Sequence, residues 1–111
     1  MPMSPVRVMA VDHREPARQA ARELVASTPG FTWLAEAATA EEALEAAIQL
    51  WPDLVLVEAG LPGIDGLETS RRLEEAVPGA VVVPLSAEED LSLETLAPEG
   101  LRALWNRSRP A

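Results

Sequence analysis

Short apolar runs alternate with amphipathic segments along the whole chain. Five short runs predict β-strands, mostly because they are apolar, and in the second run because apolar and polar residues alternate. They cover Val6–Val11, Phe31–Glu36, Leu54–Val57, Ala80–Leu85 and Leu101–Trp105. Four helices are expected between these strands, because apolar residues recur there at three- and four-residue spacing. This alternation predicts a doubly wound α/β fold, in which helices cover both faces of a five-stranded parallel sheet.

Three of the four expected helices carry an apolar stripe, and the fourth, between residues 87 and 98, is poor. The predicted packing positions of the three are Ala17, Ala20, Ala21, Leu24 and Val25; Leu44, Ala47, Ile48 and Trp51; and Leu67, Ser70, Leu73, Glu74 and Val77. Thr39 and Asp65 precede the second and third helices, and each is expected to cap the first turn. Pro84 lies within the fourth strand, where it cannot donate to the ladder and should loosen the pairing.

The run Leu54–Val57 predicts a strand that is buried on both faces. Glu58 follows it at the carboxyl end, which is where open parallel sheets bind ligands and carry chemistry. The other strand ends bring four more polar residues to the same rim: Asp12, His13, Ser86 and Arg107. Glu58 is therefore a candidate site residue, and an ordinary exposed loop acid is the alternative interpretation.

Composition and charge argue against several classes of function. The 111 residues suit one domain, residues 1–111, and the net charge of −9 argues against direct nucleic-acid binding because a polyanion would be repelled. Cysteine is absent, and the single histidine, His13, cannot by itself build a zinc site. No apolar run has the length of a membrane span, and the N-terminus lacks a secretion signal. A cytoplasmic location without membrane contact is expected.

Five short motifs, in this order, resemble the receiver domain of bacterial two-component response regulators, especially receivers that precede a helix-turn-helix output domain. The motifs are Val11-Asp12, Pro52–Glu58, Leu61–Gly66, Leu85-Ser86-Ala87 and Gly100–Arg107. The resemblance implies a flavodoxin-like sheet of strand order 2-1-3-4-5. It also implies a chemistry in which acids hold Mg²⁺ and an aspartate after the third strand accepts a phosphoryl group from a histidine kinase. A hydroxyl and a lysine then stabilise the phosphoryl oxygens.

This sequence departs from the pattern that the resemblance implies. Asp12 and Ser86 match the first acid and the hydroxyl, whereas Arg107 replaces the lysine. His13 stands where the second metal-binding acid is expected, and it is interpreted as a solvated loop residue and not as a ligand. Mg²⁺ seldom takes imidazole, so no cofactor is expected and Mg²⁺ binding is disfavoured. Glu58 stands at the acceptor aspartate, and its extra methylene would move the carboxylate by about 1.5 Å.

These departures favour a degenerate receiver, which is not an enzyme but a phosphorylation-independent module for signalling and protein interaction. Two alternatives stay open: a working phospho-accepting receiver that controls a DNA-binding output domain, and a small-ligand or metal-binding module that reuses the acidic rim. Glu58 is expected to contact Ser86 or Arg107 and to hold one conformation. The chain ends soon after Arg107, so the family's fifth helix is expected to be missing. A homodimer, or another protein partner, is then expected to cover the uncovered apolar face.

Overall fold

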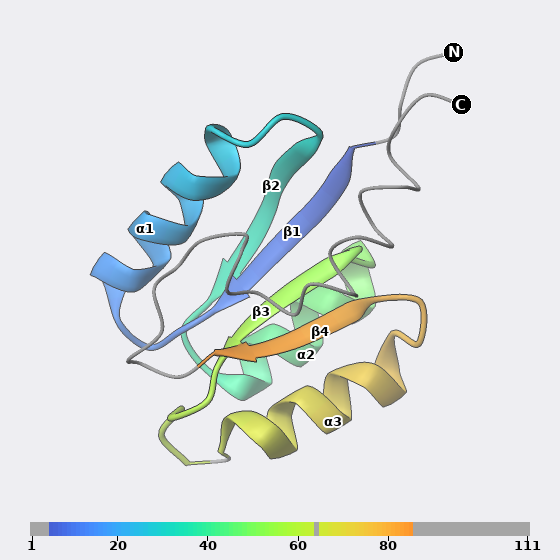
Figure 1. The fold of residues 1–111 in the computed structure, drawn as a ribbon. Helices are drawn as coiled ribbons and strands as arrows, with labels where there is room; N and C mark the ends of the chain where they lie inside the picture. Colours follow the sequence, from blue (N-terminus) through green and yellow to red (C-terminus); the bar gives the residue numbers. More distant parts are fainter. Residues whose placement is uncertain (1–4, 64, 86–111) are drawn as a thin grey trace.

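Four parallel strands form one sheet in the order β2-β1-β3-β4 (Figure 1). The structure is a computed structural model that describes residues 5–63 and 65–85. Its elements are β1 (Val6–Val11), α1 (Glu15–Ala26), β2 (Phe31–Ala37), α2 (Ala40–Leu50), β3 (Leu54–Glu58), α3 (Gly66–Ala76) and β4 (Val81–Leu85). The doubly wound parallel sheet is confirmed for the first four strands. The predicted fourth helix, the fifth strand and the missing fifth helix lie outside the described residues.

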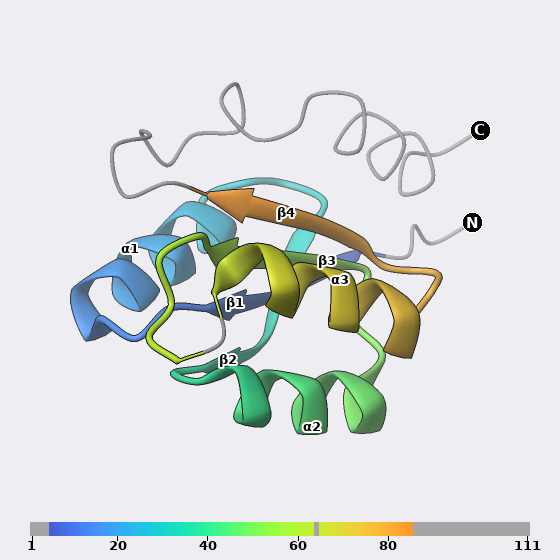
Figure 2. The ribbon, with the colours of Figure 1, turned by 90° about the horizontal axis from the view of Figure 1, so that it is seen from below.

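Helices cover both faces of the sheet, with α1 on one side and α2 and α3 on the other (Figures 1 and 2). Successive residues of β3 alternate between the two apolar clusters. Val55 and Val57 pack on the side of α2 and α3, while Leu54 and Leu56 pack with Val25 of α1. All five residues of β3 are buried, which confirms the predicted two-sided central strand. Parallel sheets of this kind need both layers, because neither face of the central strand can meet water.

The predicted apolar stripe of α2 is partly wrong. Ile48 and Trp51 are each 56% exposed, whereas the helix buries Ala47 as predicted and also buries Ala40 and Ala43. Three alanines at this spacing let the helix axis approach the sheet closely, so the small residues face inward and the large ones remain outside. Trp51 also has a φ of 52°, because it ends the helix in the left-handed conformation that usually favours glycine.

The stripes of α1 and α3 also differ from the prediction. Ala20, Leu67 and Glu74 are exposed, although all three were expected to pack. In α3 the inward face includes Thr69 and Ser70. Their hydroxyls donate to carbonyl oxygens four residues earlier, at 3.0 and 2.8 Å, which allows polar side chains to be buried at low cost. Ser70 is buried as predicted, and Thr69 is a buried position that the predicted stripe missed.

Both predicted helix caps are confirmed. The Thr39 hydroxyl accepts a hydrogen bond from the Glu42 amide at 3.2 Å, and an Asp65 carboxylate oxygen accepts from the Glu68 amide at 2.8 Å. Pro84 is exposed and pairs with Val57, so the strand continues through the proline to Leu85. Within residues 5–63 and 65–85, no helix has both the length and the apolarity that crossing a bilayer requires.

Candidate functional site

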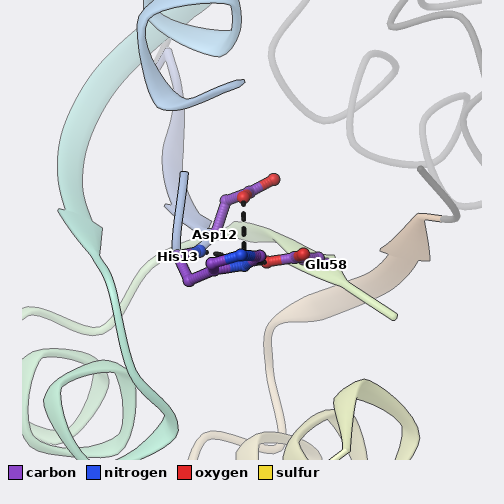
Figure 3. A group of neighbouring side chains, drawn as sticks. All are labelled: Asp12, His13 and Glu58. Atoms are coloured by element: carbon purple, nitrogen blue, oxygen red, sulfur yellow. Dashed lines mark hydrogen bonds and ion pairs between the residues drawn. The ribbon is translucent and has the colours of Figure 1, made fainter. Parts of the chain in front are cut away.

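Glu58 ends β3 and is buried, with 7% of its surface exposed. Its carboxylate points across the carboxyl end of the sheet towards the residues that follow β1 (Figure 3). The alternative interpretation, an ordinary exposed loop acid, is therefore wrong. A buried carboxylate must be compensated by hydrogen bonds or opposite charge, and both come from residues directly after β1.

His13 binds Glu58 through two atoms. Its backbone amide donates to Glu58 Oε2 at 3.0 Å, and its ring Nδ1 lies 2.8 Å from the same oxygen. A carboxylate oxygen only accepts, so the ring nitrogen carries the hydrogen in this contact. The His13 side chain is 44% exposed, which agrees with a loop residue. The sequence-based interpretation missed that it is also the main partner of Glu58.

Arg14 supplies the positive charge of the site. Its Nε and one terminal nitrogen donate to the two carboxylate oxygens of Asp12, each at 3.1 Å, in the two-pronged geometry that suits a guanidinium. Its backbone amide also donates to Asp12 Oδ1 at 2.9 Å. The same Nε lies 3.8 Å from Glu58 Oε1. Sequence reasoning did not select Arg14, and its only signal was its place in the polar cluster that directly follows β1.

Partial burial of Asp12 acts to raise the pKa of its carboxyl group, but hydrogen bonds from the side chain and the amide of Arg14 outweigh it. The pKa of Asp12 therefore lies below its usual range, and the group is ionised at neutral pH. The hydrogen bonds to Asp12 in turn raise the pKa of the Arg14 guanidinium. The site thus holds a stable ion pair beside a buried second carboxylate.

A ring of ion pairs anchors the segment that carries Asp12. Arg18 and Arg22 of α1 both pair with Glu15 and with Glu36 of β2, which ties this helix to the sheet edge. Arg18 also donates to the Asp12 carbonyl oxygen at 2.8 Å. The pKa of Glu36 is lowered, mainly by its hydrogen bond from Arg22, so the ring stays charged at neutral pH. The helix therefore positions the backbone of the site directly.

The backbone after Glu58 is tightly packed. The Ala59 amide donates to the Leu85 carbonyl at 2.7 Å, and the Ala59 carbonyl accepts from the Gly66 amide at 3.0 Å. A Cβ on Gly66 would lie 2.2 Å from the Glu58 carbonyl oxygen and 2.4 Å from the Ala59 Cα. Only glycine allows α3 to begin so close to the end of β3. This contact holds the segment that presents Glu58.

The ligand atoms of Asp12, His13 and Glu58 lie within 4.8 Å of one another, close enough to share a metal ion. The donor chemistry does not fit Mg²⁺. One donor is an imidazole, both oxygens of Asp12 already accept from Arg14, and Glu58 Oε2 accepts twice from His13. Mg²⁺ prefers an octahedron of oxygen ligands with several waters, and these residues would have to exchange their present partners to provide one.

Ser86 and Arg107 lie outside the described residues. The predicted contact of Glu58 with Ser86 or Arg107 therefore stays a prediction. The structure does bring Asp12, His13 and Glu58 together at the carboxyl end of the sheet, as expected from the strand ends.

Comparisons with known proteins agree with the motifs and the topology. A family model described as "Response regulator receiver domain" matches residues 8–101. The nitrate/nitrite response regulator protein NarL of Escherichia coli (strain K12) is 34% identical over 80 residues, which cover 71% of this chain and 37% of that protein. The response regulator GacA of Pseudomonas viridiflava is 36% identical over 86 residues, covering 77% of this chain and 40% of GacA. The chain thus matches about two fifths of these relatives' length.

Solved structures show the same fold. A LuxR-family two-component response regulator from Aurantimonas sp. SI85-9A1 superposes with a TM-score of 0.71 at 29% identity, covering 90% of this chain and 69% of that one. The response regulator domain of Thermotoga maritima CheB superposes with a TM-score of 0.69 at 26% identity, covering 88% and 72%. Both superpositions cover most of this chain.

Proposed function

The chain belongs to the response regulator receiver family, and on that premise we propose that it is a degenerate receiver. It would act in two-component signalling as a phosphorylation-independent module that binds a protein partner, and not as an enzyme. The observation that carries this proposal is the state of Glu58, which is buried at the acceptor position and held by the amide and ring of His13.

The contacts of the Glu58 carboxylate, which stands at the position of the nucleophile, support the proposal. An acceptor carboxylate needs one oxygen free to attack phosphorus, and attack depends on placement to within about 1 Å. Glu58 Oε2 accepts two hydrogen bonds, and Oε1 faces the guanidinium of Arg14 at 3.8 Å. These contacts lower the reactivity of both oxygens. The longer side chain of glutamate also extends beyond the position that an aspartate would occupy.

The residues that could bind a metal ion support the same proposal. Phosphoryl transfer in this family relies on a divalent cation to neutralise the incoming group. The donor set of Asp12, His13 and Glu58 fits Mg²⁺ poorly, because an imidazole replaces an acid and both oxygens of Asp12 and Oε2 of Glu58 already accept hydrogen bonds. Negative charge on a phosphoryl group would therefore meet two carboxylates without the ion that normally offsets them.

Acetyl phosphate and MgCl₂, followed by intact-mass analysis, test the proposal. We expect no added phosphoryl group on the wild-type chain under conditions that label an aspartate-bearing receiver. A stable phosphoryl adduct that disappears in Glu58→Gln would instead establish the alternative function, a working acceptor that controls an output domain. The double variant His13→Asp with Glu58→Asp restores both family acids and is the matched variant in which labelling is expected to rise.

The protein partner is part of the proposal. A second copy of this chain is the first candidate, as expected from the sequence. Light scattering over a range of protein concentrations checks it: a rise in mass towards that of a dimer supports self-association, and a constant monomer mass at high concentration overturns it.

A further inference from the structure

We propose that the guanidinium of Arg14 is the resident cation of the acidic site and takes the charge-balancing role that a divalent metal has in this family. The inference rests on the proposed function for the identity of the site, and it deepens that function by explaining how the acidic site remains folded without a metal. It concerns one side chain, Arg14, and two carboxylates, those of Asp12 and Glu58.

The first argument is contact geometry. Arg14 binds both oxygens of Asp12 with its Nε and a terminal nitrogen, and the same Nε lies 3.8 Å from Glu58 Oε1. Within residues 5–63 and 65–85, it is the arginine whose guanidinium lies within ion-pair distance of both carboxylates. Arg18, another nearby arginine, contacts the backbone carbonyl oxygen of Asp12 and pairs with Glu15 and Glu36.

The second argument is charge balance. Two carboxylates whose oxygens approach within 4.8 Å repel each other strongly when one of them is buried. The Arg14 guanidinium offsets one charge, and the amide and ring N–H groups of His13 stabilise the other by hydrogen bonding. Among residues 5–63 and 65–85, the compensation comes from the two residues that directly follow Asp12 in the chain.

The third argument is competition. A divalent ion that entered this cluster would compete with Arg14 for Asp12, whose two oxygens already accept three hydrogen bonds from that residue. Arg14 is tethered two residues away, and its backbone amide already binds the same carboxylate at 2.9 Å. A tethered competitor acts at high effective concentration, so free Mg²⁺ at millimolar levels should fail to replace it.

Thermal unfolding in EDTA and in rising MgCl₂ or MnCl₂ tests the inference on the full chain. We expect the wild-type melting temperature to change by less than about 1 °C. Arg14→Ala should melt lower in EDTA and recover with at least one of the two ions, by roughly 5 °C at about ten times the Kd. Mn²⁺ should act more strongly, because it accepts an imidazole ligand more readily.

Two further variants make the result specific. Arg72→Ala removes the same charge from α3, where Arg72 pairs with Glu68, and should show no response to either ion. Arg14→Lys keeps a cation and should resemble the wild type. If Arg14→Ala does not fold, Arg14→Gln takes its place, since the Arg14 side chain is 43% exposed and glutamine retains its polarity.

Three outcomes would overturn the inference. The first is a wild-type response to the cations that is as large as the response of Arg14→Ala. The second is no response in Arg14→Ala, or in Arg14→Gln where this variant takes its place. The third is an equal response in Arg72→Ala. These readings are independent of the phosphorylation test. If the wild type binds Mg²⁺ but takes no phosphoryl group, only the proposed role of Arg14 is contradicted. If the wild type is phosphorylated, the proposed function is contradicted.

Discussion

His13 Nδ1 lies 2.8 Å from Glu58 Oε2, and the His13 amide donates to that same oxygen at 3.0 Å. One residue of the loop after β1 thus holds the buried carboxylate at the end of β3 from both its backbone and its ring. This pairing replaces the acid–acid pair that the family pattern implies. It fixes the Glu58 carboxylate by two hydrogen bonds from one residue, and substitutions at His13 test this directly.

Replacing His13 with aspartate should destabilise the protein and make its stability depend on Mg²⁺. His13→Asp would place a third carboxylate beside Asp12 and Glu58, so we expect a loss of about 1–2 kcal/mol in the free energy of unfolding. Added MgCl₂ should restore most of it, because the new carboxylate and Glu58 can then offer oxygen ligands while Arg14 keeps its hydrogen bonds to Asp12. Urea denaturation with and without MgCl₂ measures both effects. His13→Asn, which adds no charge, is the control and should not respond to the ion.

Arg18 should contribute more to stability than Arg22. Both belong to the ring with Glu15 and Glu36, but only Arg18 also donates to the Asp12 carbonyl. Its side chain is the less exposed of the two. We expect Arg18→Ala to cost about 1–2 kcal/mol and Arg22→Ala to cost clearly less, measured by urea denaturation. Equal losses for the two variants would show that the carbonyl contact has no separate effect.

Gly66→Ala should be strongly destabilising, whereas Gly60→Ala should not. The added Cβ at Gly66 would meet the backbone of Glu58 and Ala59, which cannot rotate away as a side chain can. We expect a loss of about 3 kcal/mol. Gly60 lies on the same connection and has nothing within 4 Å of an added Cβ, so it is the matched control. Thermal unfolding of the two variants gives the comparison, and similar melting temperatures would contradict the close approach of α3.

Acid should weaken the protein partly through Glu68. Hydrogen bonds from Arg71 and Arg72 lower the pKa of Glu68 from 4.5 to about 2. A carboxyl with a lowered pKa in the folded state adds stability above its unfolded pKa, and this contribution is lost as the pH falls from about 4.5 to about 2. Glu68→Gln should therefore flatten the pH dependence of the urea midpoint in this window. Glu74→Gln, at an exposed position of the same helix, should leave the slope nearly unchanged.

The sequence predicts most of the described fold because the strands carry a strong signal. Leu54–Glu58 is apolar up to its last residue, and it is buried throughout. The helix faces are predicted less well, since Ile48 and Trp51 appear more suitable for a core than the alanines that pack there. Hydrophobicity ranks side chains one at a time, whereas close helix–sheet packing selects small residues by shape.

The site is predicted in part for a similar reason. Strand ends place Asp12, His13 and Glu58 together, because topology alone brings the carboxyl ends of β1 and β3 to one edge. The role of Arg14 could not be predicted in this way. A long side chain in a loop can reach several partners. Which partner it binds depends on its side-chain torsion angles, and the pattern of apolar and polar residues carries no information about these angles.

Ala59 joins the end of β3 to the end of β4 and to the start of α3 through backbone groups alone. Its amide donates to the Leu85 carbonyl, and its carbonyl accepts from the Gly66 amide. No exchange of side chains at Asp12, His13 or Glu58 removes either bond. These two bonds therefore persist whichever side chains stand at the site. A receiver built in this way can exchange a reactive side chain and keep the connection between β3, β4 and α3.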